Sequence, residues 1–449
     1  MAAPTRPKVL VVLLDGEVAG ELRQDRDGRL TFVYDEDYRS QDAPTPLSLS
    51  MRPTRREHRH RVVDPFLRGL LPDAQAVLDR WAERFHVSAN NPFALLTHVG
   101  EDVAGAAQFV LPDRVDEVRT GGALEPVSED YIAERLAVLR ADRAAWNDPA
   151  SPGQFSLAGA QSKFALYRDG ESGAWFVPTG RFATTHILKP ALPNLNDQDI
   201  NEHLCLVAAN NLGLDAAHSQ VLRFGDERAV VLDRYDRIAT GPGTVERLHQ
   251  EDFCQALGLP PSAKYERGEP GEVGRGPGVV RMVELMREVQ GAMDAERSEW
   301  HYVSALAFNW LIYAPDAHAK NYAILLDRTD AQPSPLYDIS SVLPYPRTGG
   351  PRGEGFDLRH MAMAMSVNGQ FENGLVTGQD WAALARRLKL DPDAVLALVR
   401  QLAERVPDAF ADAARANASV IGEGNTMVRV LVDGVASYSA NLRFHLSVG

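Results

Sequence analysis

The spacing of hydrophobic positions changes along the chain from a period of two to helical periodicity, and this change predicts the order of its elements. Near the amino terminus, short apolar runs lie between Asp-Gly turns, which predicts a small antiparallel meander. Its strands are expected at 8–14, 17–22 and 30–34. Helical patterning follows at about 64–85 and, behind Ser128 as a capping residue, at 128–146. The first 150 residues are therefore predicted to form an α+β module.

Strand patterns return after a segment at 148–153 that contains proline and glycine and is predicted to be a junction. A helix is expected at 201–212, where Gly213 would end it. The strands around this helix are expected at 164–168, 186–189 and 229–234. This part of the chain is thus predicted to be rich in β-structure.

The remainder of the chain is mainly helical in pattern. Helices are expected at 279–289, 300–313, 379–387 and 391–417. A β-rich part followed by a helical part predicts an α+β fold with two lobes. The expected units are an amino-terminal module at 1–150, a β-rich lobe at 151–248 and a mainly helical lobe at 249–449.

Composition and charge narrow the class of protein. The chain has 449 residues, of which 45% are hydrophobic and 24% charged, as in globular proteins with substantial cores. The formal net charge of −14 disfavours a DNA-coating role, so contact with DNA would need a local patch or a partner. Two cysteines without ligand-spaced partners exclude a disulfide framework and a cysteine zinc site. A signal sequence and a membrane-spanning run are both absent, which predicts a cytoplasmic protein without membrane contact.

The segment 315–324 carries the most specific chemistry. Asp316 and Asn321 are five positions apart, between an apolar helix and a strand. Phosphoryl transfer requires a carboxylate near the attacking hydroxyl and an oxygen ligand for magnesium, and this pair can supply both. With His318 between them, the spacing is also similar to the catalytic loop of lipid kinases related to phosphatidylinositol kinases. A helix-capping Asp and a turn-forming Asn are the alternative.

Asp338 is a second acidic candidate in an apolar, strand-like setting. A lone carboxylate is costly to bury unless it is paired or bound to a cation, and magnesium offers that compensation. A turn-forming Asp after Pro335 is the alternative interpretation.

Lys189 ends an apolar strand, where its ammonium could reach nucleotide phosphates. Glu202 on the following helix could pair with it, as a helix Glu does in protein kinases. A solvent-facing Lys and a solvated helix acid remain open as alternatives.

The loop at 155–163 precedes the first strand of the β-rich lobe, where a nucleotide-covering loop is expected. It has a single glycine, so it is neither a Gly-x-Gly-x-x-Gly loop nor a Walker A sequence. Its small residues permit close backbone approach, whereas a plain hairpin loop with Ser156 as a turn residue is the alternative. Further along, Asp233 and Tyr235 lie where a hinge between lobes could offer contacts to adenine, or only surface ion pairs.

Four segments, at 155–161, 184–189, 250–255 and 316–321, together resemble the HipA serine/threonine kinases of bacterial toxin–antitoxin systems. The resemblance covers nearly the whole chain. It implies that Asp316 is the catalytic Asp and that Asn321 and Asp338 are magnesium ligands. It also implies that Ser156 is autophosphorylated, which would move the loop out and silence the enzyme. Nucleotide contacts are expected from this resemblance and from the position of the loop at 155–163. They are Ser156, Leu157, Ala158, Gly159, Ala160, Gln161, Lys163, Lys189, Asp233, Tyr235, His318 and Lys320.

The same resemblance implies cofactors and partners. They are ATP, Mg²⁺, a protein substrate such as an aminoacyl-tRNA synthetase, and a helix-turn-helix antitoxin of the HipB type through which DNA is mainly contacted. Ala317 and Asp233 depart from the Gly and the Glu that are common in this family. A catalytically silent, nucleotide-binding corepressor that acts with the antitoxin is the alternative.

Overall fold

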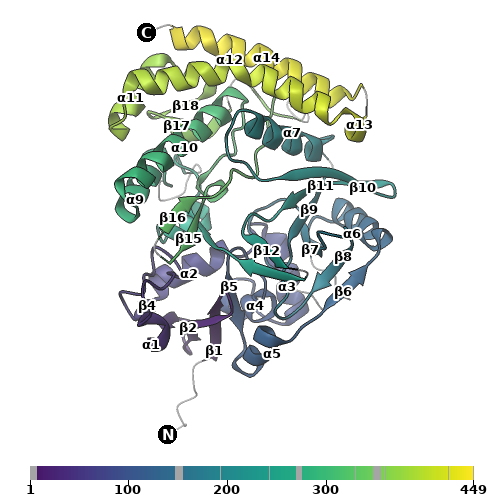
Figure 1. The fold of residues 1–449 in the computed structure, drawn as a ribbon, viewed down its shortest axis with the longest axis vertical. Helices are drawn as coiled ribbons and strands as arrows, with labels where there is room; N and C mark the ends of the chain where they lie inside the picture. The colour runs from purple at the N-terminus through teal and green to yellow at the C-terminus, as the bar shows by residue number, and fades with distance from the viewer. Residues whose placement is uncertain are drawn as a thin grey trace.

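The computed structural model describes residues 8–146, 155–192, 194–241, 243–268, 276–328, 330–346, 355–358, 361–422 and 424–447. The predicted junction at 148–153 lies outside these ranges. Figure 1 shows the amino-terminal module at one end of the molecule, the carboxy-terminal helices at the other, and a sheet between them. The predicted α+β, two-lobed plan is confirmed.

The amino-terminal module is built on a five-stranded antiparallel sheet in the order β4-β3-β2-β1-β5. The predicted meander is confirmed as its centre, and alternate residues such as Leu10 and Val12 are fully buried. The strands are β1 (Lys8–Leu14), β2 (Glu17–Gln24), β3 (Leu30–Tyr34), β4 (Glu57–Arg59) and β5 (Ala107–Val110). The helices of the module are α1 (Glu36–Arg39), α2 (His60–Gly69), α3 (Gln75–Phe85), α4 (Pro92–Val99) and α5 (Val115–Thr120).

The helix predicted at 64–85 is instead two helices, α2 and α3, separated by residues 70–74, here called the α2–α3 turn. Pro72 lies in this turn, and a proline biases the residue before it away from the helical conformation. Gly69 ends α2 at a crowded point, because a Cβ atom there would lie 2.5 Å from Cγ of Gln255. The chain therefore turns where two segments pack too closely for a side chain.

The central sheet has six strands in the order β10-β11-β9-β7-β8-β6, all paired antiparallel. Its strands are β6 (Leu124–Val127), β7 (Phe164–Arg168), β8 (Trp175–Pro178), β9 (His186–Pro190), β10 (Ser219–Phe224) and β11 (Glu227–Asp233). The helix α6 (Glu129–Ala141), capped by Ser128 as predicted, packs on this sheet. Thus β6 is a strand of the central sheet and α6 packs on that sheet, although both precede the predicted boundary at 150.

The two faces of the central sheet belong to different hydrophobic cores. Along β11, Ala229 and Val231 pack into the core of the amino-terminal module, whereas Val230 and Leu232 pack into the core of the helical lobe. On that second face lies α7 (Gln198–Asn211), which packs against α12 (Pro392–Ala416), as Figure 1 shows. Successive side chains of a strand point to opposite faces, so the amino-terminal module and the helical lobe pack on opposite faces of the same sheet.

The helical lobe contains α8 (Phe253–Ala256), α9 (Val279–Val289), α10 (Ala292–Leu311), α11 (Gly378–Leu388), α12, α13 (Ala418–Ile421) and α14 (Thr426–Ser447). The sequence did not predict α14. In the part of the chain that the structure describes, three small sheets accompany these helices. They are β12 (Arg237–Gly241) with β13 (Thr244–Arg247), the three-stranded sheet of β14 (His249–Asp252), β15 (Ala323–Asp327) and β16 (Asp330–Pro333), and β17 (Ala362–Val367) with β18 (Gln370–Glu372). Within the described ranges, no helix is both long and apolar enough to cross a membrane.

Candidate active site

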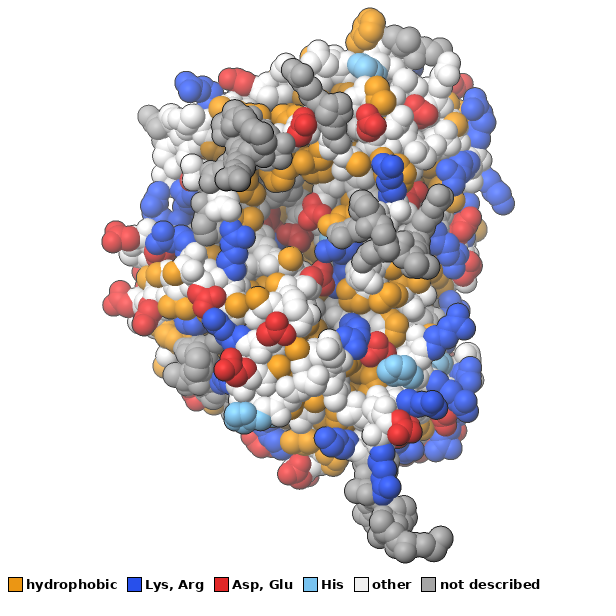
Figure 2. Space-filling model, turned by 180° about the vertical axis from the view of Figure 1, so that it is seen from behind, with side chains coloured by type: hydrophobic (Ala, Val, Ile, Leu, Met, Phe, Trp, Pro, Cys, Tyr) orange, Lys and Arg blue, Asp and Glu red, His pale blue; other side chains and the backbone are white. Residues whose placement is uncertain are grey.

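A cavity of about 450 Å³ lies between the central sheet, the helical lobe and the α2–α3 turn. Figure 2 shows acidic side chains on the floor of a hollow near the middle of the molecule. Every predicted site residue except Ser156 lines this cavity. They are Leu157, Ala158, Gly159, Ala160, Gln161, Lys163, Lys189, Asp233, Tyr235, Asp316, His318, Lys320, Asn321 and Asp338.

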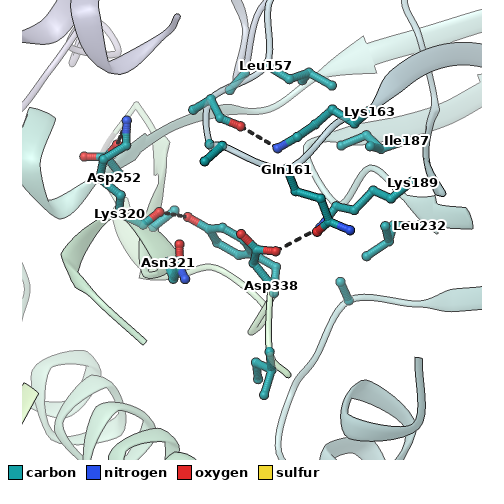
Figure 3. Close-up of a pocket in the computed structure, with 18 of the residues that line it drawn as sticks. Leu157, Gln161, Lys163, Ile187, Lys189, Leu232, Asp252, Lys320, Asn321 and Asp338 are labelled. Carbon is teal, nitrogen blue, oxygen red and sulfur yellow. Dashed lines mark hydrogen bonds and ion pairs between the residues drawn. The ribbon is translucent and has the colours of Figure 1, made fainter. Parts of the chain in front are cut away.

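Lys189 holds two carboxylates together at one wall of the cavity. Its Nζ lies 2.6 Å from Oε1 of Glu202 and 3.0 Å from Oδ1 of Asp338. Burial alone would lower the pKa of Lys189, but Asp338 and Glu202 outweigh it and raise the pKa. Figure 3 shows Lys189 and Asp338 directed toward each other. The predicted pairing of Lys189 with the helix Glu is present, with Asp338 as a second partner.

Asp338 faces the cavity from the segment that follows β16. Its backbone is left-handed, with φ at 56°, and a third of its side chain is exposed. Burial would raise the pKa of this carboxyl, but Lys189 and Lys163 outweigh burial and keep it ionised. An anionic side chain that reaches the cavity while paired on its other side is able to accept a cation.

Asp316 and Asn321 are brought together by the loop that leads into β15. The side-chain nitrogen of Asn321 donates to the carbonyl of Asp316 at 2.9 Å, which leaves its amide oxygen as the atom able to ligate. Tyr265 donates its hydroxyl to Oδ1 of Asp316 at 2.9 Å. The carboxylate of Asp316 reaches solvent in the cavity, yet the enclosing walls raise its pKa, and the negative charge of Asp338 adds to the rise.

The loop at 155–163 crosses the opposite wall of the cavity, as Figure 3 shows for Leu157, Gln161 and Lys163. Gly159 has a φ of 100°, a conformation that side-chain-bearing residues rarely adopt. Lys163 donates to the carbonyl of Ala158 at 2.6 Å, and Gln161 donates to Gln198 of α7 at 2.9 Å. Burial, together with the nearby Lys189, lowers the pKa of Lys163 to about 8. The loop thus presents small residues and one lysine toward the space below it.

Ser156 does not line the cavity, so its predicted contact with the nucleotide is not made in this conformation. Its side chain is fully buried, and its hydroxyl donates to the carbonyl of Leu70 at 2.8 Å. Its backbone N–H donates to the carbonyl of Asp102 at 2.9 Å. Both bonds are to the amino-terminal module, which therefore holds the start of the loop.

The hinge residues take different positions. The ring of Tyr235 lies 5.7 Å from the ring of Tyr337, and both line the cavity. The carboxylate of Asp233 is instead directed to His186, whose Nε2 lies 3.2 Å away, and half of the Asp233 side chain is exposed. Tyr235 therefore remains the stronger candidate for an adenine contact.

Two predicted nucleotide contacts between Asp316 and Asn321 have other partners here. The ammonium of Lys320 is directed to Asp73 of the α2–α3 turn, at 2.8 Å. The ring of His318 is buried against Tyr265, and burial lowers its pKa to about 3, so it is neutral at physiological pH. Lys320 is thus engaged in an ion pair with the amino-terminal module.

The residues that line or contact the cavity and that sequence reasoning missed include Asp73, Gln198, Lys264 and Tyr265. The pattern Leu-Leu-Pro-Asp at 70–73 carried a helix-breaking signal that would have placed a turn at Asp73. The other three carry no motif of their own. Their importance depends on contacts between segments far apart in the chain.

The buried Lys–Glu pair, the covering loop and the Asp-to-Asn segment between two lobes define a kinase-like class of protein. Two family models match the chain: the HipA-like C-terminal domain over residues 155–410 and the HipA N-terminal domain over residues 10–110. The chain belongs to the HipA family, and it is a HipA-like kinase.

Relatives along the full length agree with this membership. The protein Y4mE of Sinorhizobium fredii is 33% identical over 415 residues, which span 91% of this chain and 95% of Y4mE. The serine/threonine-protein kinase toxin HipA of Shewanella oneidensis is 29% identical over 78% of this chain and 77% of that protein. A solved structure, the complex of HipA, HipB and operator DNA from Shewanella oneidensis, matches with a TM-score of 0.77 at 26% identity and covers 97% of this chain and 96% of that one.

Proposed function

We propose that this chain is an ATP- and Mg²⁺-dependent serine/threonine protein kinase that acts as a HipA-like toxin. The observation that carries the proposal is the position of Lys189, which joins Glu202 and Asp338 at the wall of a cavity that Asp316 also lines. Protein kinases need a Lys–Glu ion pair and an Asp that binds magnesium, and Glu202 and Asp338 are placed beside Lys189 to supply them.

The residues present fit a nucleotide bound with magnesium. Asn321 and Asp338 would hold the ion through an amide oxygen and a carboxylate, which are the ligands that magnesium prefers. In the described part of the chain, no cluster of three His, Cys, Asp or Glu side chains could hold a metal by itself. Phosphate oxygens would therefore complete the coordination, as is usual for magnesium in kinases. The bound ion would neutralise charge on the phosphates.

Asp316 would orient the attacking serine or threonine hydroxyl and accept its proton. The raised pKa of Asp316, caused by the enclosing cleft walls and by Asp338, makes its carboxylate a better proton acceptor near neutral pH. Lys189 would contact the phosphates, and its charge would stabilise the negative charge that develops there. Placement and electrostatics would supply the catalysis.

Autophosphorylation of Ser156 remains part of the proposal and requires a change of conformation. Because the Ser156 side chain is fully buried and bonded to Leu70, its hydroxyl can meet a nucleotide only after the start of the loop leaves the module. The phosphate would then carry about two negative charges and could not return to this buried position without a compensating partner.

We further propose that this protein acts in the cytoplasm on a component of the translation machinery, such as an aminoacyl-tRNA synthetase, and that it binds a helix-turn-helix antitoxin of the HipB type. The solved relative is described in a complex with HipB and operator DNA. The net charge of −14 on this chain supports contact with DNA mainly through such a partner.

The test is transfer of radiolabelled γ-phosphate from ATP by the purified chain, with the labelled residues mapped by mass spectrometry. Wild-type protein is expected to label itself at Ser156, and Asp316→Asn is expected to lose about 100-fold or more of the rate. Asp327→Asn, the same change at an exposed position of β15, serves as the matched control and should retain the rate. Equal labelling by wild type and Asp316→Asn would refute the kinase assignment, and nucleotide binding without any transfer would refute it in favour of the silent corepressor.

A further inference from the structure

The α2–α3 turn of the amino-terminal module contacts both the loop that covers the cavity and the loop that carries Asp316. On the first side, the carbonyl of Leu70 accepts from the hydroxyl of Ser156 at 2.8 Å. The backbone N–H of Asp73 donates to the carbonyl of Gly159 at 2.9 Å, and Pro72 forms an isolated parallel bridge with Gly159. The turn therefore binds the covering loop at two points, near its start and at its glycine.

On the second side, the carboxylate of Asp73 binds two lysines of the helical lobe. Its Oδ1 lies 2.8 Å from Nζ of Lys320, and its Oδ2 lies 3.1 Å from Nζ of Lys264. Lys320 belongs to the short 3₁₀ helix (Ala319–Asn321) that follows Asp316 and ends at Asn321. One side chain of the module thus fixes the segment that connects the two principal candidate residues.

These ion pairs are buried, so they differ from ordinary surface pairs. The exposed fractions are 12% for the Asp73 side chain, 18% for Lys264 and 2% for Lys320. Burial would raise the pKa of Asp73, but Lys320 and Lys264 outweigh it and hold the pKa below its usual value. Loss of Asp73 would leave Lys320 only the more distant carboxylate of Asp252, at 4.0 Å, so a buried charge would lose its nearest partner, whereas exposed pairs contribute little.

The turn is also anchored to the helical lobe independently of Asp73. Gly69 packs directly on Gln255 of α8, and the side-chain amide of Gln255 donates to the carbonyl of Phe66 at 2.9 Å. Gln255 is in turn fixed by a capping box with Asp252. Because the turn is attached to the helical lobe, its bonds to Gly159 and Ser156 set the position of the covering loop relative to Asp316.

We propose that Asp73 is a positioning residue for phosphoryl transfer, through which the amino-terminal module sets the distance between the covering loop and the catalytic loop. This inference rests on the proposed kinase function. The module then determines part of the active-site geometry, and displacement of the α2–α3 turn separates the two loops.

The test compares Asp73→Asn with Asp73→Glu and with Asp64→Asn in the full chain. Asp64 is the matched control, because it lies on α2 and its ion pair, with Arg68 at 2.8 Å, stays within that helix. Two measurements are made: amide hydrogen exchange of segments 156–163 and 316–322 without nucleotide, and kcat/KM for ATP in phosphotransfer. Asp73→Asn is expected to exchange about tenfold faster in both segments and to lose about 100-fold in kcat/KM.

Asp73→Glu keeps the charge on a longer side chain and should recover at least about tenfold of the lost kcat/KM. Asp64→Asn should stay within about twofold of wild type in both measurements. Wild-type exchange or wild-type kcat/KM in Asp73→Asn would overturn the inference, as would a deficit that Asp73→Glu does not relieve. If Asp73→Asn does not fold, Lys264→Gln must show faster exchange in both segments. A wild-type protein that transfers no phosphate would refute the kinase function alone, since the exchange measurement needs no turnover.

Discussion

Glu202→Gln isolates the contribution of the buried Lys189 pair. The substitution keeps the shape of the side chain and removes its charge. Nζ of Lys189 lies 2.6 Å from Oε1 of Glu202, and their side chains are only 6% and 0% exposed. After the change, Lys189 retains Asp338 at 3.0 Å as its partner. We expect the ammonium to move toward Asp338 and compete with a metal ion for that carboxylate.

The magnitude follows from burial. Removing one partner of a buried ion pair costs about 3–5 kcal/mol when the other charge is left unpaired. Since Asp338 still compensates Lys189, the free energy of unfolding should fall by about 1–3 kcal/mol. The fall in kcat/KM should exceed what the loss of unfolding free energy alone would cause, because the ammonium of Lys189 is no longer held in position. A 100-fold fall in kcat/KM corresponds to about 2.7 kcal/mol of transition-state stabilisation.

Asp199→Asn is a matched control on the same helix, α7. The Asp199 side chain is also fully buried, and its Oδ2 lies 2.6 Å from Nε of Arg228. Arg228 keeps a second carboxylate, Asp197, at 2.5 Å, just as Lys189 keeps Asp338. Asp199 does not line the cavity, so Asp199→Asn should cost similar stability and leave kcat/KM within about threefold.

The assay combines urea unfolding with single-turnover phosphotransfer at saturating and limiting ATP. Loss of stability by both variants with loss of activity by Glu202→Gln alone supports the assigned role. If Glu202→Gln and Asp199→Asn lose stability alike and both remain active, the Lys189 pair is structural and the reasoning fails.

Three further predictions concern the same region. Burial raises the pKa of Glu251 from 4.5 to about 8, so the stability from its protonated form is fully present below pH 4.5 and is lost as pH rises through 8. In Glu251→Gln, the decline of unfolding free energy between about pH 5 and 8 should therefore lessen by up to about 1.4 kcal/mol per pH unit, measured by urea unfolding. Gly159→Ala should raise KM for ATP at least about threefold, because a Cβ there would meet Nζ of Lys163 at 2.9 Å and the φ of 100° would be strained; a wild-type KM would contradict this. The kcat/KM of wild type should fall as acid protonates Asp316, whose pKa is raised by the enclosing walls and by Asp338, and the residual activity of Asp316→Asn should lack that acid limb.

Local patterns predicted much of the fold correctly. The meander, the capped helix behind Ser128 and the helix at 279–289 are determined by turns, caps and periodicity within short segments, and the structure contains all three. The order of the site segments was also evident from the sequence, because Lys189, Asp316 and Asp338 lie in recognisable local contexts. Their convergence on one cavity was not, because it depends on how the sheet and the helical lobe pack.

The residues that were missed or misassigned depend on contacts between distant segments. The sequence predicts a continuous helix across the α2–α3 turn, whereas in the structure Gly69 at its start packs on Gln255, a residue far away in the chain. The sequence also predicts that Lys320 contacts the nucleotide, but it gives no sign that the ammonium of Lys320 pairs with Asp73. A charged residue near a motif gives no indication of its partner until the partner segment is placed.

The amino-terminal module also contacts the hinge beside the cavity. Nη2 of Arg237 lies 2.9 Å from Asp102 of the module, and Nη2 of Arg234 donates to the carbonyl of Val103 at 2.8 Å. Both arginine side chains are 2% exposed and also pair with Asp236, so separating the module from the hinge would remove one of the two carboxylates that compensate these buried charges. Asp102 also accepts, through its backbone carbonyl, from the N–H of Ser156. The hinge, the covering loop and the loop that carries Asp316 are therefore all attached to one module, and a partner that shifts the module would be expected to change their positions relative to one another.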